Sequence, residues 1–408
     1  MFPLKRYKLL IFLFFFFVVT GCSKKNEEKL IMEDLSSKTK MEIEEYAQSN
    51  YLDLQIEYQY SDTILKDKVI SQSILPGEEY LKNVALNVTI SLGNIKEVYK
   101  EKKVNEVGRI PVMMYHGIVS LKDEETPYIG GNVDKDGYHR TTESFRRDLE
   151  FYYKQGYRMI SLNDYIDGKI DVPLGYSPIV LTFDDGLPNS IHIIGKDENG
   201  NLIIDPECAV GILEEYKQKY PDYQVTATFF VNGGLFQQSN YNEEILKWLV
   251  THGYDVGNHS YSHPNFNNLT KEEASIEIGR VYNLLDNIIP NQYVSIVALP
   301  YGSPGKKTNA SFEGILSSSY NGKNYQTKST LQVGWESNYS PFSKQFDVQF
   351  IKRIRAYDNN GFNFDITYSF QKLEQNRYIS DGNSSQIVIP LENQEYLKNN
   401  LEFEIITY

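Results

Sequence analysis

An apolar run ends in two carboxylates and a glycine in the segment Ile179-Val180-Leu181-Thr182-Phe183-Asp184-Asp185-Gly186. Such a run predicts a buried strand that opens into a turn. Because successive side chains of a strand point to opposite faces, Asp184 and Asp185 point to different sides. One can bind a cation while the other, a few ångströms away, faces a water on that cation. Gly186 supplies the sharp turn. By itself such a turn is common, and a solvated surface turn is the alternative.

Two histidines lie four residues apart in the segment Asn258-His259-Ser260-Tyr261-Ser262-His263-Pro264. Residues with this spacing share one face of a helical turn, so their imidazoles can hold one divalent ion. An unrelated pair of surface histidines is the alternative, although four of the six histidines lie elsewhere. Together the two segments offer one carboxylate and two imidazoles, a ligand set that leaves positions for water and substrate.

Strands and helices alternate outward from these segments. We expect strands at Ile110–Tyr115, Ile179–Phe183, Ala227–Val231 and Ile296–Leu299, and helices at Ser144–Tyr157, Asn242–Thr251 and Lys271–Ile288. This alternation predicts an α/β fold built as a distorted barrel, with an insertion at Leu187–Gln224 beside the first motif. Beyond Asp358 the chain is rich in Asn, Gln and Tyr, with strand-like patches at Gln386–Ile389 and Phe403–Thr407.

A smaller α+β unit precedes the barrel. Asp34–Gln48 has helical spacing, and short alternating stretches follow at Leu52–Tyr58, Val69–Ile74 and Val84–Leu92, with Pro76-Gly77 as a turn. One helix and three strands in this order resemble a PASTA domain. The resemblance implies either a module that binds peptidoglycan fragments or a spacer, and both roles stay open.

The bulk composition excludes one class of partner. The 408-residue chain has a formal net charge of −13, so it lacks the basic footprint that nucleic acid binding requires. Hydrophobic residues at 41% and charged residues at 23% indicate a globular protein. Only Cys22 and Cys208 occur, and two cysteines so far apart build neither a disulfide framework nor a cysteine-based zinc site.

The N-terminus has the pattern of an export signal. Three basic residues precede an apolar run, Leu9–Val19, which is shorter than the ~20 residues that span a bilayer. The run ends in Val19-Thr20-Gly21-Cys22, which resembles the lipobox of bacterial lipoproteins. This resemblance implies a lipid on Cys22 and a folded part outside the cytoplasm, anchored to the cell membrane. A plain membrane anchor with an incidental cysteine is the alternative.

These observations give six predicted segments. They are a signal peptide at 1–21, a polar tether at 22–29, the PASTA-like domain at 30–95, a charged linker at 96–108, the α/β domain at 109–358 and a C-terminal extension of unassigned role at 359–408.

The α/β domain resembles the polysaccharide deacetylases, carbohydrate esterase family 4. The resemblance rests on Thr182–Gly186, on His259 and His263, and on Thr226–Val231 between them. It implies that Asp184 is the general base. It also implies that Asp185, His259 and His263 bind one divalent ion, zinc or a similar metal.

A third segment, Ala298-Leu299-Pro300-Tyr301-Gly302, departs from the commonest family pattern. An arginine that holds the catalytic aspartate usually stands at the position of Ala298. A subgroup that acts on exported poly-N-acetylglucosamine shares this absence and also opens with a Tyr-His segment. By resemblance, Pro300 and Tyr301 contribute to oxyanion and substrate binding through the Tyr301 N–H. Trp335 is a candidate wall of the acetyl site, although a lone Trp is more often a core residue.

The general acid is the least determined part of the site. In most of the family a late histidine protonates the leaving amine, but no histidine follows His263. The candidates are His116, His139, His192 and His252. His252 precedes a glycine at a predicted helix end, where capping explains it, and His139 and His192 lie in loop-like sequence. His116 follows the strand that ends at Tyr115, where barrel chemistry is usually placed, and its segment resembles the opening of the poly-N-acetylglucosamine deacetylases, so we predict His116 as the acid.

The resemblance implies a hydrolase that removes N-acetyl groups from poly-N-acetylglucosamine or peptidoglycan at the cell surface. Two alternatives stay open. One is a glycan-binding lipoprotein with a degenerate site, which the missing arginine and missing late histidine favour. The other is an esterase that removes O-acetyl groups or acetyl-xylan decoration with the same residues.

Overall fold

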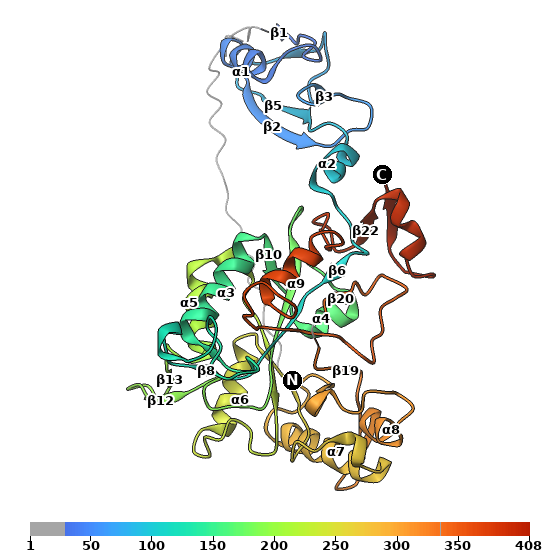
Figure 1. Ribbon diagram of the computed structural model, residues 1–408. Helices are drawn as coiled ribbons and strands as arrows, with labels where there is room; N and C mark the ends of the chain where they lie inside the picture. The colour runs from blue at the N-terminus through green and yellow to red at the C-terminus, as the bar shows by residue number, and fades with distance from the viewer. Residues whose placement is uncertain (1–28, 335) are drawn as a thin grey trace, which may run out of the picture. The chain divides into compact units, whose positions relative to one another are not determined.

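The computed structural model describes residues 29–334 and 336–408 (Figure 1). The predicted signal peptide, Cys22 and Trp335 lie outside these residues. The chain divides after Glu97 into two compact units, each with its own core. Among the described residues, no helix has both the length and the apolar character needed to cross a membrane.

The first unit is a three-stranded sheet with one helix. The helix begins at Lys40 rather than at Asp34, because Thr39 and Glu42 form a capping box that satisfies the first backbone N–H groups. Leu86, Val88 and Ile90 of the central strand are buried beneath it. The elements are β1 (Leu30–Ile31), α1 (Lys40–Ser49), β2 (Asp53–Gln59), β3 (Val69–Gln72), β4 (Glu79–Tyr80) and β5 (Ala85–Ser91), with sheet order β2-β5-β3.

The second unit is built on a curled parallel sheet. Seven strands follow the order β19-β16-β15-β14-β11-β7-β21, and β10 pairs with β11 beside this path. Every pairing in the sheet is parallel, as the alternation of strands and helices predicts. The strands are β7 (Val112–Tyr115), β10 (Tyr157–Met159), β11 (Ser177–Phe183), β14 (Thr228–Val231), β15 (Asp255–Asn258), β16 (Ile296–Ala298), β19 (Ser329–Leu331) and β21 (Ile354–Arg355).

The segment 351–355 joins the two edges of this sheet. Ile351 forms a parallel bridge with Leu331 of β19, and three residues later β21 pairs with β7 through Ile354 and Met113. The segment therefore joins the edges of a curled half-barrel, which agrees with the predicted distorted barrel. Arg353, in the middle of the closing segment, is fully buried.

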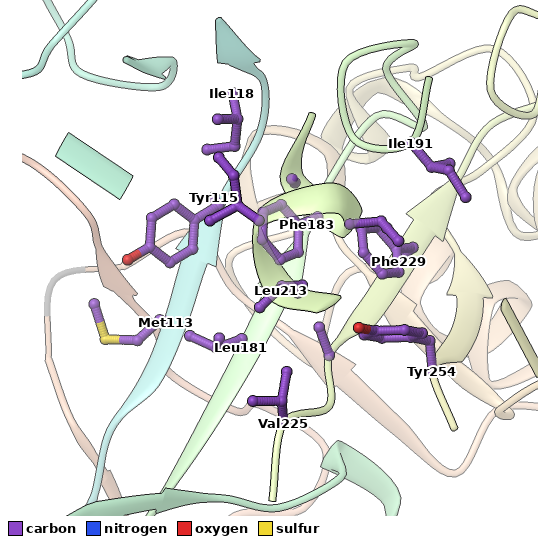
Figure 2. Close-up of a cluster of buried hydrophobic side chains, with 14 of the residues drawn as sticks. Met113, Tyr115, Ile118, Leu181, Phe183, Ile191, Leu213, Val225, Phe229 and Tyr254 are labelled. Carbon is purple, nitrogen blue, oxygen red and sulfur yellow. The ribbon is translucent and has the colours of Figure 1, made fainter. Parts of the chain in front are cut away.

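Helices cover the outer side of the sheet. Side chains of neighbouring strands stack there: the rings of Tyr115 and Phe183 lie 5.3 Å apart and those of Phe183 and Phe229 4.9 Å apart (Figure 2). The helices α3 and α5 lie side by side over this layer (Figure 1). The main helices are α3 (Thr142–Lys154), α4 (Leu162–Asp167), α5 (Ala209–Lys219), α6 (Asn242–Thr251), α7 (Lys271–Ile288), α8 (Ala310–Leu316) and α9 (Ile366–Leu373).

The alternate residues of the same strands form a second cluster inside the barrel, with Val112, Val180, Phe230, Ala298 and Leu331 among its members. The remaining short elements are α2 (Ile95–Lys102), β6 (Arg109–Ile110), β8 (Ile118–Val119), β9 (Arg140–Thr141), β12 (Ile193–Lys196), β13 (Leu202–Ile204), β17 (Ser317–Tyr320), β18 (Lys323–Gln326), β20 (Asn338–Tyr339), β22 (Gln386–Ile389), β23 (Glu404–Thr407) and the 3₁₀ turns η1 (Asp123–Glu125), η2 (Pro221–Tyr223), η3 (Phe266–Asn268), η4 (Pro300–Gly302) and η5 (Leu391–Tyr396).

Two predicted boundaries differ from the structure. The charged stretch 96–108 is not a free linker, because α2 occupies its first part and Val104 and Val107 are buried in the second unit. The residues after 358 belong to that unit too: Ile387 and Ile389 lie in the same core cluster as barrel residues. The charged residues of 96–108 suggested an exposed linker, but the apolar residues between them are buried in the core of the second unit.

Buried Glu106 links these two segments. It accepts hydrogen bonds from the Val388 N–H (2.7 Å) and the Tyr378 hydroxyl (2.8 Å). Burial, together with the nearby charge of Asp381, raises the pKa of Glu106 from 4.5 to about 8, although the hydrogen bonds act in the opposite direction.

We expect the raised pKa of Glu106 to make stability depend on pH. Between pH 4.5 and 8 the folded state binds more protons at this group than the unfolded state does. The free energy of unfolding therefore falls as the pH rises through this window and is constant above it. Glu106→Gln removes this dependence. The melting temperature of the variant minus that of the parent should therefore increase from pH 5 to pH 8. Glu101→Gln, at an exposed side chain, is the control. A difference between parent and Glu106→Gln that does not change with pH would contradict this.

Candidate active site

Asp185, His259 and His263 converge at one end of the barrel. Asp185 follows β11, and the two histidines follow β15, so the carboxyl ends of two parallel strands deliver all three side chains. His259 Nε2 lies 3.1 Å and His263 Nε2 3.4 Å from Asp185 Oδ1. Ligand atoms of all three residues lie within 4.8 Å of one another. Among the described residues, no other such group of His, Cys, Asp or Glu occurs.

The chemistry of these donors fits a small divalent cation. His259 Nδ1 lies 2.8 Å from the carbonyl oxygen of Ala298, so in the neutral ring the proton is on Nδ1 and Nε2 carries a lone pair. That lone pair faces a carboxylate oxygen, an arrangement that a cation between them would stabilise. Tetrahedral zinc with bonds of about 2.0–2.1 Å places its ligand atoms about 3.3 Å apart, which agrees with the separations from Asp185 Oδ1.

The backbone around the two histidines is not the predicted helical turn. Ser260 and His263 have φ of 63° and 56°, in the left-handed region, so the chain bends after β15 instead of forming a helix. Both histidines still point their Nε2 atoms to Asp185 Oδ1, and Asn258 Oδ1 accepts from the Ser260 N–H within the bend. Gly186 turns the other segment: a Cβ there would lie 2.2 Å from the Leu235 carbonyl oxygen, so only glycine fits.

Asp184 points away from this cluster and pairs with Arg353 inside the barrel. Two parallel hydrogen bonds join them, from Nη1 to Oδ1 (2.8 Å) and from Nη2 to Oδ2 (2.7 Å). Arg353 also donates to the Thr182 hydroxyl and to the Gln332 carbonyl oxygen. The different directions of Asp184 and Asp185 agree with the predicted alternation, but the sequence analysis did not identify Arg353.

Arg353 fixes the charge of Asp184 as well as its position. Burial by itself would raise the pKa of Asp184, but the charge of Arg353, with smaller contributions from His259, holds that pKa well below its ordinary value. The carboxylate therefore stays ionised and can accept a proton.

These side chains share one cavity of about 280 Å³. Its lining includes Asp184, the three clustered ligands, Leu299 and Val333, and also His116, Tyr138, His139 and Tyr301. His116 follows β7, the strand next to β11, as its position after Tyr115 predicts.

His116 is partly buried, and its Nδ1, which is buried, has no hydrogen-bond partner in the described part of the chain. Burial, partly offset by the charges of Asp184 and Asp185, lowers the pKa of His116 from 6.5 to about 4. At neutral pH the imidazole is therefore uncharged. The Tyr138 ring packs edge-on against it at 5.0 Å and holds it in place.

The structure separates the other candidate acids. His252 caps α6, with Nδ1 2.8 Å from the Trp248 carbonyl oxygen, as the sequence indicates. His192 pairs with Asp205 and lines a different cavity. His139, placed in a loop by the sequence analysis, lies in the active-site cavity immediately before β9.

Tyr301 lies at the same cavity with φ of 56°. Its N–H donates to no acceptor in residues 29–334 and 336–408, and its exposed ring packs edge-on against His263 at 4.6 Å. Pro300 is buried beside it and does not line the cavity; its carbonyl oxygen accepts from Ser303. The other predicted wall, Trp335, falls outside the described residues.

Parts of the chain are similar to known proteins. Residues 172–314 match the family model described as polysaccharide deacetylase, and residues 30–92 match the PASTA domain model. A peptidoglycan-N-acetylmuramic acid deacetylase of Bacillus subtilis is 34% identical over 124 residues, 30% of this chain and 21% of that protein. A peptidoglycan-N-acetylglucosamine deacetylase of Bacillus cereus is 28% identical over 130 residues, 32% of this chain and 38% of that protein.

The chain thus spans about a fifth to two fifths of these relatives. Among solved structures, the Streptococcus pyogenes deacetylase PplD in complex with acetate aligns over 66% of this chain and 98% of its own, with 18% identity and a TM-score of 0.45.

Proposed function

Because the chain carries a polysaccharide deacetylase domain and a PASTA domain, we propose that it is a metal-dependent hydrolase that removes N-acetyl groups from a cell-wall or surface glycan containing N-acetylglucosamine. The observation that carries the proposal is that two adjacent carboxylates have different partners in one cavity. Asp184 is held ionised by Arg353, and Asp185 gathers with two histidines in the same cavity.

Asp185, His259 and His263 would hold the ion, for which zinc fits the ligand types and spacing. When bound, the ion would acidify a water and polarise the acetamide carbonyl. Asp184 accepts the proton of the attacking water. The Tyr301 N–H donates to the oxyanion that develops on the acetamide carbonyl. Hydrolysis then gives acetate and a free amine on the sugar.

His116 delivers the proton to the departing amine. Since its pKa is lowered to about 4, the imidazole enters the reaction uncharged and first takes up a proton in the cavity. That proton is the one that Asp184 accepts from the attacking water and passes on within the cavity, so no further donor is needed. This role is the general acid that the sequence analysis assigned to His116.

A degenerate binding protein is the weaker candidate. Two absences favoured it, that of the family arginine at Ala298 and that of a late histidine. Arg353 lies beside Asp184 and comes from the segment that precedes β21, and His116 lines the cavity. Both observations support an active enzyme. An O-acetyl or acetyl-xylan esterase would use the same residues, so it is an outcome of the test below.

The relatives favour peptidoglycan over poly-N-acetylglucosamine as the glycan, because both curated matches quoted above are named for peptidoglycan sugars. A PASTA domain in the same chain agrees with a cell-wall substrate.

The experiment is acetate release by the full chain from peptidoglycan, an N-acetylglucosamine pentamer, poly-N-acetylglucosamine and acetylated xylan, with and without a chelator. We expect release from an N-acetylated glycan that stops on chelation and returns with Zn²⁺. Release from xylan alone would assign the esterase. No release from any substrate, with glycan binding retained, would assign the binding protein.

We propose further that Cys22 carries lipid and holds the enzyme at the outer face of the cell membrane. Acyl chains on one cysteine, together with exposure of the PASTA domain to the wall, would place the site next to its substrate. Cys22→Ala should move the protein from the membrane fraction to the medium or leave it unprocessed. Unchanged fractionation and gel mobility would reject the anchor.

A further inference from the structure

We propose that His139 is a substrate-binding residue whose Nε2–H donates a hydrogen bond to an oxygen of the glycan. This inference rests on the proposed function and adds a residue through which the same cavity recognises a sugar. His139 lines that cavity with His116 and Tyr301, yet neither the metal cluster nor the proton transfers described above use it.

The tautomer of His139 follows from one backbone contact. The Gly117 N–H donates to His139 Nδ1 at 3.2 Å. An Nδ1 that accepts a hydrogen bond carries no proton, so the proton of the neutral ring is on Nε2. No atom of residues 29–334 and 336–408 accepts from Nε2. The ring therefore presents an N–H donor without a partner at the cavity.

The same contact distinguishes His139 from His116. His139 Nδ1 already accepts from the Gly117 N–H, so His139 is suited to donate a hydrogen bond through Nε2. The Nδ1 of His116 has no such contact among the described residues.

The loop around His139 is rigid before substrate arrives. Asp134 accepts hydrogen bonds from the N–H groups of Tyr138 and His139 (3.2 and 2.8 Å), and the Val133 N–H donates to the His139 carbonyl oxygen. Immediately after it, β9 pairs with β8 through Arg140 and Ile118. A donor held in place in this way loses little freedom on binding.

Gly117 is required for this arrangement. A Cβ at position 117 would lie 2.4 Å from His139 Nδ1 and 2.9 Å from the side chain of Asn189. Any side chain at Gly117 must displace His139, which gives an independent way to move the imidazole.

A sugar is the ligand that fits this part of the cavity. The exposed ring of Tyr301 and the ring of Tyr138 offer aromatic faces to the apolar C–H groups of a pyranose. Hydroxyl, ring and glycosidic oxygens of the glycan can accept from an uncharged N–H. An acetyl group attached to a small non-sugar alcohol lacks these acceptors, so a non-sugar ester should not need His139.

The test compares kinetics on the N-acetylglucosamine pentamer and on 4-nitrophenyl acetate. Loss of one uncharged hydrogen bond corresponds to roughly a 2- to 13-fold effect. We expect His139→Phe to raise KM for the pentamer by that factor, with kcat within about twofold, and to leave kcat/KM for 4-nitrophenyl acetate unchanged. Gly117→Ala should give the same pattern. His139→Gln, which keeps a donor near Nε2, should restore most of the pentamer affinity.

His252→Phe is the matched control, because it makes the same change at a helix end outside the cavity. An equal loss by His139→Phe on both substrates would show a structural or chemical role and overturn the inference, as would an unchanged KM for the pentamer. If the parent releases no acetate from any glycan, the proposed function fails separately. Calorimetric binding of the pentamer to parent and His139→Phe then decides the inference: equal affinities reject it.

Discussion

His116→Ala should lower the rate of acetate release by about 10²–10⁴-fold, the usual contribution of a positioned acid or base. His116 lines the cavity with Asp184 but is not among the clustered metal ligands. The variant therefore loses proton delivery to the amine and keeps the residues that hold the ion. Because the buried Nδ1 atom of His116 has no partner in the described residues, removal of the ring leaves no hydrogen-bond donor unsatisfied there.

The measurement is the initial rate of acetate release, with metal content determined on the same preparation. His252→Ala, an identical change outside the cavity, should match the parent in both. A His116→Ala protein with a near-parental rate would remove this histidine from the mechanism. Loss of metal together with activity would instead assign His116 to the ligand set.

Arg353→Met should have the largest combined effect on stability and activity. It leaves the buried carboxylate of Asp184 without its partner, since the two side chains are 0% and 1% exposed. Removal of one member of a buried ion pair costs about 3–5 kcal/mol of unfolding free energy. The rate should fall by ~10²-fold or more, because Asp184 loses both its orientation and the charge that keeps it ionised.

Denaturant unfolding of the second unit, followed with acetate release, checks this expectation. The double variant Arg353→Met/Asp184→Asn should regain most of the lost stability, because no uncompensated charge remains, but no activity. Lys352→Met is the control one residue away: its exposed pair with Glu336 is worth about 0–1 kcal/mol. Equal stability of Arg353→Met and Lys352→Met would show that the buried pair does not act as described.

Local patterns predicted the elements that carry strong local signals. The helices α6 and α7 have the bounds that their spacing predicts, and Thr270 with Glu273 forms the capping box that starts the second of them. The short strands β19 and β21 were not predicted, because two or three residues are too few to show the alternation of apolar and polar residues that marks a strand. Their place in the sheet depends on pairing partners far away in the chain.

The sequence by itself determined which residues we propose as metal ligands and base, because each pair follows one strand directly. Asp184 with Asp185 and His259 with His263 are fixed within a few residues, so the fold has only to bring two strand ends together. This also explains why the histidine pair was identified although its predicted helical turn was wrong.

Only the tertiary structure decided which other side chains complete the site. Arg353 lies 169 residues after Asp184 and reaches it because the segment 351–355 closes the barrel. His139 reaches the cavity because the Gly117 N–H, 22 residues earlier, holds its ring. Neither contact follows from spacing, since hydrogen bonds between distant segments depend on how the strand edges meet and not on the order of residues along the chain.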